Sequence, residues 1–217
     1  MSECRYALWP SGAICAEGPG AWHIGGVLVT PHFSVLKDRS MPTATPDLRL
    51  LEGVVAPRVL TAMRGASAAL TALGVRHAVA GGLAVGAHGY PRNTIDVDLL
   101  VGDEAFERHA GGLVTLKPGV PIQVDGVGVD LLSTSGGDAF LERSLPRPVE
   151  GEVHVISAAT LVYLKLKSPR LKDRSDVVEL VKAGLDVESV RKALERDAPA
   201  LVDRLNECVA QARTEEG

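Results

Sequence analysis

Two aspartates one residue apart, shortly after a glycine pair, constrain this chain more than any other feature. Residues 77–82 run from an apolar stretch into the glycine pair, and residues 94–101 then carry Asp96 and Asp98 in an otherwise apolar segment. The pattern predicts a strand, a glycine turn, a short helix and a second strand. Because side chains alternate between the two faces of a strand, Asp96 and Asp98 are expected to point the same way.

A third aspartate, Asp130, lies in the middle of the apolar segment 127–132. A carboxylate in a buried strand is costly unless it has a partner or a metal. Three carboxylates from two adjacent strands could hold two Mg²⁺ ions, because hard oxygen ligands suit Mg²⁺ and do not suit zinc. We therefore expect Asp96, Asp98 and Asp130 to be metal ligands and catalytic residues, and the third carboxylate, Asp130, could also accept a proton.

Such a site supports in-line phosphoryl transfer from a nucleoside triphosphate. Gly81 and Gly82 let the backbone approach a phosphate, and a helix expected to begin at Leu83 would direct its amide N–H groups there. Arg92 and Thr94 precede the aspartates in a turn. Both are nucleotide-binding candidates; Arg92 could reach a phosphate or the base, or could be an ordinary exposed turn residue.

The densest basic stretch of the chain, residues 165–174, supplies two further nucleotide-binding candidates, Lys165 and Lys172. Both could neutralise triphosphate charge. The alternative is a solvated helix–loop–helix whose lysines pair with Asp173 and Asp176. Those two aspartates share a helix face and could cap the helix, pair with Lys172 or Arg92, or help to shape the site; we favour a structural role.

The glycine pair, the segment 92–98 and Asp130 together resemble the nucleotidyltransferase fold of the DNA polymerase β superfamily, most closely its AbiEii/AbiGii toxin-like and minimal nucleotidyltransferases. The likeness covers about residues 58–185 and includes a lysine followed by a Lys/Arg-Asp-x-x-Asp segment at 161–177. Many transferases of the superfamily have a serine where Gly82 stands, so the glycine favours the toxin-like branch.

The resemblance implies transfer of a nucleoside monophosphate from a nucleoside triphosphate such as ATP to an acceptor hydroxyl, with Mg²⁺ as cofactor. An RNA end or a protein side chain is favoured as acceptor over a small molecule, and the chain could be the toxin of a toxin–antitoxin pair with an antitoxin as partner. The alternatives are a non-catalytic nucleotide-binding or antitoxin-like module of the same fold, and a calcium-stabilised structural site.

The order of apolar patterns predicts an α+β fold, a mixed α/β arrangement in which helices flank a nucleotidyltransferase-type mixed sheet and a C-terminal helical lobe follows. The expected parts are a poorly defined N-terminal extension (1–45) with one strand-like run (26–29), the nucleotidyltransferase core (46–156) and the helical lobe (157–217). Strands are predicted at 76–80, 95–101, 113–116, 122–124, 127–132 and 153–156. Helices are predicted at 58–73, 83–88, 103–110, 138–143, 157–167, 172–183, 187–195 and 198–213.

Composition excludes several classes of protein. The net charge is −4 and aromatic residues make up 4% of the 217 residues, so neither a global basic field nor an aromatic stacking platform for RNA is expected. No apolar run reaches the ~18 residues of a membrane-spanning helix, and the N-terminus lacks the pattern of a signal peptide. We therefore expect no membrane partner and a cytoplasmic location.

Overall fold

The structure is a computed structural model of the chain. It describes residues 45–106, 116–117, 120–134 and 138–216, and four short strands nearer the N-terminus. The chain divides into two compact units, Met1–Ser40 and Met41–Gly217. In the first unit β1 (Ala7–Trp9) pairs antiparallel with β2 (Gly12–Ile14), and β3 (Trp22–Ile24) pairs antiparallel with β4 (Val27–Val29). The strand predicted at 26–29 is confirmed as β4.

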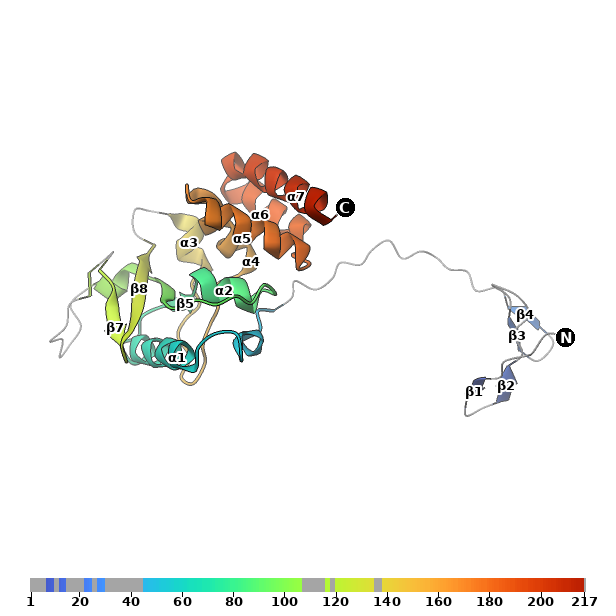
Figure 1. The fold of residues 1–217 in the computed structure, drawn as a ribbon, viewed down its shortest axis with the longest axis horizontal. Coiled ribbons are helices and arrows are strands. Elements are labelled where there is room, and N and C mark those ends of the chain that lie inside the picture. Colours follow the sequence, from blue (N-terminus) through green and yellow to red (C-terminus); the bar gives the residue numbers. More distant parts are fainter. Residues whose placement is uncertain are drawn as a thin grey trace. The chain divides into compact units, whose positions relative to one another are not determined.

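A four-stranded mixed sheet forms the centre of the second unit, in the order β5-β6-β8-β7 (Figure 1). Its strands are β5 (His77–Val79), β6 (Val97–Val101), β7 (Ile122–Val124) and β8 (Val127–Ser133). β6 runs antiparallel to β5 and parallel to β8, and β7 forms a hairpin with β8. Asp125 and Gly126, both with positive φ, close this hairpin, as a tight two-residue turn requires.

Helices cover both faces of this sheet (Figure 1). The α-helices are α1 (Pro57–Ala72), α2 (Gly81–Ala87), α3 (Ala139–Ser144), α4 (Ala158–Lys167), α5 (Leu171–Lys182), α6 (Val187–Asp197) and α7 (Val202–Glu216). The short 3₁₀ helices are η1 (Leu48–Leu51), η2 (Asp103–Phe106) and η3 (Pro199–Leu201). Helices and a mixed sheet together confirm the predicted α+β class. No helix in the described ranges is both long and apolar enough to cross a membrane.

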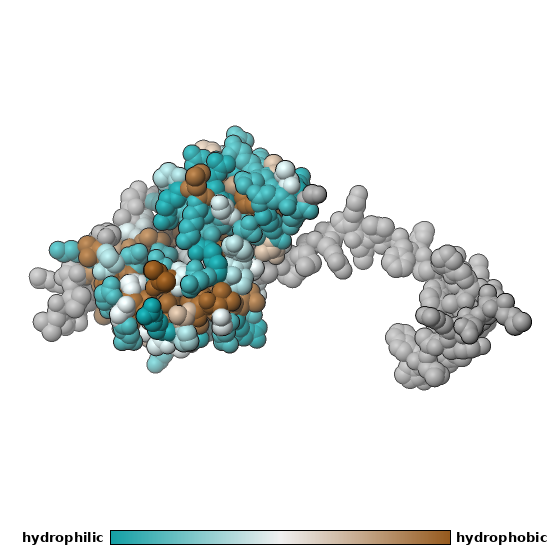
Figure 2. Space-filling view, viewed as in Figure 1, coloured by the Kyte–Doolittle hydropathy of each residue, from teal (hydrophilic) through white to brown (hydrophobic). Residues whose placement is uncertain are grey.

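The period-2 alternation of β6 separates two apolar cores. Val97, Leu99 and Val101 face α1 and belong to one core, whereas Leu100 faces the other way, into a core shared with α2 and α4–α7. Asp98 has the parity of Leu100, so it lies on the face of the sheet toward the C-terminal helices. The space-filling view shows that these helices present a mainly hydrophilic surface on the side seen there (Figure 2).

Two expected boundaries around the glycine pair and the aspartates are wrong. The helix expected to begin at Leu83 begins at Gly81, and the strand expected from residue 95 begins at Val97. Asp96 therefore precedes β6 and is exposed, rather than sharing a strand face with Asp98. The Thr94 hydroxyl donates to Asp96 Oδ1 (2.7 Å), and such a local side-chain bond favours a bend over a strand.

Other expected elements differ in detail. Residues 153–156 form no strand; Val155 makes a single parallel bridge to Val79 at the edge of the sheet. The helix predicted at 198–213 divides into η3 and α7. Ala198, which precedes Pro199, lies outside the helical region of the backbone (φ −154°, ψ 58°), as expected of a residue before proline. Of the predicted helix 103–110, η2 accounts for the first half, and residues 107–110 lie outside the described residues, as does most of the predicted strand 113–116.

Candidate functional site

The acidic trio, defined as Asp96, Asp98 and Asp130, lies at the start of β6 and opposite it in the middle of β8. Asp98 of β6 and Asp130 of β8 are direct partners in the strand register, and both are half-buried. Burial raises the pKa of Asp98, and the charges of Asp96 and Asp130 raise it further, while Lys165 opposes them. Asp98 therefore lies within electrostatic range of both other carboxylates.

Gly81 and Gly82 lie against the acidic trio, at the start of α2. Gly81 has φ +56°, and a Cβ built on it would overlap the Asp98 carboxylate. The Gly82 N–H donates to Asp98. The glycine pair therefore allows the backbone to come close to another group, as expected, but that group is the Asp98 carboxylate. The same carboxylate accepts a hydrogen bond from the Gly82 N–H, one of the backbone amides at the start of α2.

Thr94 and Arg92 lie on the other side of the glycine pair. A Cβ built on Gly82 would be 3.0 Å from Thr94 Oγ1 and 3.6 Å from Arg92 Nη1. Thr94 is buried and fixes Asp96 through the hydrogen bond described above. The turn 91–94 therefore brings a hydroxyl and a guanidinium close to the start of α2, next to the acidic trio.

Arg92 begins a chain of five alternating charges that we call the ionic network: Arg92, Asp176, Lys165, Asp173 and Arg170. Arg92 donates through Nε (3.0 Å) and Nη2 (2.9 Å) to the two carboxylate oxygens of Asp176. Lys165 Nζ donates to Asp176 Oδ2 (2.7 Å) and to Asp173 Oδ1 (2.6 Å). Arg170 Nε donates to Asp173 Oδ2 (2.7 Å). The network connects the turn before β6 with α4 and α5 and carries one net positive charge.

The interior of the network is buried, and its outer end is not. Lys165, Asp173 and Asp176 are 7%, 2% and 3% exposed. Although burial raises the pKa of Asp173, the hydrogen bonds from Lys165, Ser168 and Arg170 outweigh it and leave the pKa lowered, so this carboxylate stays ionised. The Arg170 side chain is 75% exposed.

The structure brings together most of the predicted site residues and adds three. The acidic trio, the glycine pair, Thr94, Arg92 and Lys165 lie in one neighbourhood. Lys172 stands apart on the exposed first turn of α5 and forms no hydrogen bond or ion pair with any residue that the structure describes. The sequence favours a structural role for Asp173 and Asp176. In the structure, Asp176 accepts hydrogen bonds from Arg92 and Lys165, and Asp173 accepts one from Lys165. Arg170 was not a predicted site residue. Asp173 is the main group that raises the pKa of Arg170, and Asp98 adds to this rise, so Asp98 lies within electrostatic range of the guanidinium.

Carboxylate oxygens are the donors that Mg²⁺ prefers, and the crowded charges that raise the pKa of Asp98 are what a divalent cation would relieve. The donor set of the acidic trio therefore fits the ion. As the side chains stand, the described part of the chain holds no group of three or more His, Cys, Asp or Glu residues already arranged around a metal position.

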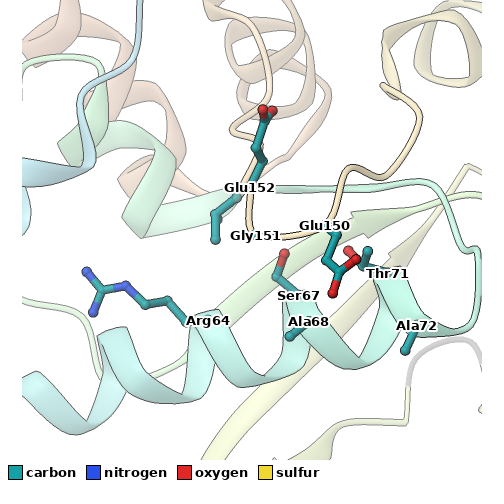
Figure 3. A pocket seen from close by; sticks show the side chains of 9 residues that line it. Arg64, Ser67, Ala68, Thr71, Ala72, Glu150, Gly151 and Glu152 are labelled. Carbon is teal, nitrogen blue, oxygen red and sulfur yellow. The ribbon is translucent and has the colours of Figure 1, made fainter.

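A cavity of about 570 Å³ lies elsewhere, between α1 and the loop 150–153 (Figure 3). Glu150 points toward α1, and Glu152 points away from it. Ser67, in the cavity wall, is hydrogen-bonded to His77 Nε2 (2.7 Å), and the other ring nitrogen of His77 bonds the Val75 carbonyl (2.8 Å). The lining includes none of the acidic trio and no member of the ionic network, so we place the candidate site at the trio.

Comparison of the chain with protein-family models and with curated proteins finds no match. Its function is therefore inferred from the residues described above.

Proposed function

We propose that the chain is a magnesium-dependent nucleotidyltransferase that moves a nucleoside monophosphate from a nucleoside triphosphate to an acceptor hydroxyl. The observation that carries this proposal is the pairing of Asp98 with Asp130 across parallel strands, with their charges crowded beside a glycine pair and opposed by buried Lys165. Three carboxylates next to a cationic network provide both halves of what a metal–triphosphate complex needs: oxygen ligands and positive charge for the phosphates.

The resemblance of residues 58–185 to the DNA polymerase β superfamily, noted from the sequence, supports the same reaction class. Its toxin-like branch favours an RNA end or a protein side chain as acceptor, and an antitoxin as partner. The proposals of acceptor and partner rest on this resemblance alone.

In the proposed reaction, the acceptor oxygen forms a bond to the α-phosphorus as the bond from that phosphorus to the oxygen leading to the β-phosphate breaks. The electron pair of the broken bond leaves with pyrophosphate, and the acceptor proton passes to a carboxylate. Asp130, the third carboxylate of the acidic trio, would accept it. Asp96, Asp98 and Asp130 would hold Mg²⁺, which when bound neutralises phosphate charge and lowers the pKa of the acceptor hydroxyl.

Arg92 supplies fixed positive charge beside Gly82, and Lys165 supplies it within electrostatic range of Asp98. The bidentate bond to Asp176 uses Nε and Nη2 of Arg92 and leaves Nη1 toward Gly82. A guanidinium held in this way is suited to a phosphate oxygen, because its orientation is set before the ligand binds.

The test is incubation of the full chain with each α-³²P-labelled nucleoside triphosphate, Mg²⁺, and total RNA or protein from a cell lysate. We expect labelled RNA or labelled protein with the native chain and none with Asp96→Ala or Asp98→Ala. The matched control is Asp203→Ala, which removes an exposed carboxylate on α7 and should leave labelling unchanged. Tight binding of triphosphate without labelled product from any nucleotide would instead indicate a non-catalytic binding module.

A further inference from the structure

Asp176 occupies the one position in the ionic network where two predicted phosphate-binding cations meet. Its Oδ2 accepts from Arg92 Nη2 (2.9 Å) and from Lys165 Nζ (2.7 Å), and its Oδ1 accepts from Arg92 Nε (3.0 Å). Arg92 and Lys165 come from segments more than 70 positions apart, so a carboxylate from a third segment, α5, is what joins them.

Both cations also lie near the candidate site. Arg92 Nη1 lies next to Gly82, and the charge of Lys165 lowers the pKa of Asp98 against the effect of Asp96 and Asp130. Asp176, on α5, binds the Nε and Nη2 atoms of Arg92, and the remaining Nη1 atom lies near Gly82.

We propose that Asp176 is a positioning residue that sets Arg92 and Lys165 for the triphosphate of the substrate. This inference rests on the proposed function. Asp173 shares the task for Lys165 alone, because its second oxygen is bound by exposed Arg170. Asp176 is the member whose loss affects both cations at once.

Asp176→Asn is the informative change because it keeps the shape of the side chain. An amide has one acceptor oxygen, and its NH₂ group is a donor that would face the N–H donors of Arg92 or Lys165. At least one cation then loses its partner and its orientation. Loss of a charge-assisted hydrogen bond of this kind corresponds to roughly 10- to 100-fold weaker triphosphate binding.

The experiment is a double-mutant cycle on the full chain with Arg92→Ala, Asp176→Asn and the double variant. Binding of each of the four ribonucleoside triphosphates with Mg²⁺ is measured by calorimetry, and KM and kcat are measured in the labelling reaction. We expect Asp176→Asn to raise Kd and KM by about 10- to 100-fold in the native background. In the Arg92→Ala background the same change should have a smaller effect, because only the part that acts through Lys165 remains. Asp176→Glu should restore part of the affinity.

The control for lost stability is Asp197→Asn. Asp197 likewise joins two arginines, Arg143 (2.8 Å) and Arg196 (2.7 Å), but belongs to α6 and takes no part in the ionic network. It should leave Kd and KM unchanged. The native chain being active, unchanged Kd and KM in Asp176→Asn would overturn the positioning role. Full additivity of the effects of Arg92→Ala and Asp176→Asn would overturn it as well. Either result would leave the proposed function standing. A native chain that neither binds nor transfers any nucleotide would overturn both.

Discussion

Gly81 meets two separate constraints, which substitution can distinguish. Its φ of +56° is strained for any residue with a Cβ, and a Cβ there would also overlap the Asp98 carboxylate. Gly81→Ala should therefore lower the free energy of unfolding by more than the ~1–2 kcal/mol typical of left-handed backbone alone, and should abolish nucleotide transfer by displacing Asp98. Urea unfolding and the labelling reaction measure the two effects.

The matched control is Gly184→Ala. Gly184 also has positive φ (+94°), but its Cβ would meet no atom within 4 Å. This variant should show the backbone cost alone and keep its activity. Equal losses of stability in the two variants would mean that Asp98 moves aside at no cost.

Asp98 is expected to lower the stability of the fold that carries it. Its folded-state pKa is raised by burial and by neighbouring carboxylates, so its contribution is most favourable below the ordinary Asp pKa and is lost as pH rises through the folded value. At neutral pH the charged form is therefore a cost, and Asp98→Asn should raise Tm by a few degrees at pH 7 without added metal, with a smaller gain near pH 4. Calorimetry over pH 4–8 tests this. A Tm gain that does not depend on pH would contradict it, and Asp203→Asn, an exposed carboxylate, serves as control.

At the scale of elements, Arg76 joins the start of β5 to η2 and to α3. It donates from Nε (2.8 Å) and Nη2 (2.9 Å) to Glu104 and from Nη2 (2.9 Å) to Glu142. The hydrogen bonds from Arg76 hold the pKa of Glu104 at about 2, below its ordinary value of 4.5. This stabilisation is present above pH 4.5 and is lost as pH falls toward 2.

We expect Glu104→Gln to lower the free energy of unfolding by about 2 kcal/mol at pH 7, after allowing for solvent screening of a partly exposed pair, and by little near pH 2. Denaturant unfolding at several pH values measures the difference. Glu207→Gln, which breaks the exposed pair with Arg174, should cost less than ~1 kcal/mol. A Glu104→Gln loss that persists at pH 2 would show that packing, not charge, supplies the stability.

Local patterns predicted most of the elements but fewer of the long-range side-chain partners. The apolar run 127–132 correctly indicated β8, and the pairing of this strand with the strand of Asp98 was expected from one shared carboxylate site. The side chain of Thr94, which bends the chain before β6, defeated the expectation that Asp96 and Asp98 share a strand face. The bond of Arg92 to Asp176 spans 84 positions, and no periodicity encodes such a partner. Arg170 was missed because an arginine just before a helix is usually an exposed surface residue.

At the scale of the whole second unit, the candidate site joins the sheet to the C-terminal helices. Asp98 and Asp130 belong to strands, Gly81 to α2, and the ionic network ties the turn before β6 to α4 and α5. A ligand that bridges the acidic trio and the network would hold these elements together. Since such a ligand binds only the folded chain, it should raise Tm in proportion to its free-energy of binding.

We expect a nucleoside triphosphate with Mg²⁺, at about 100 times its Kd, to stabilise the chain by about 2.7 kcal/mol, a Tm shift of roughly 5–10 °C for a domain of this size. The triphosphate without Mg²⁺ should give much less, because its charge then faces three unneutralised carboxylates. Asp98→Asn should lose most of the shift, whereas Asp197→Asn should keep it. Thermal unfolding with each metal and nucleotide alone and together separates the proposals: calcium-dependent melting with no triphosphate effect would indicate a structural ion site instead. A Tm shift that needs both Mg²⁺ and the triphosphate is the expected outcome, because the acidic trio would bind the metal and the cations of the ionic network would bind the phosphates.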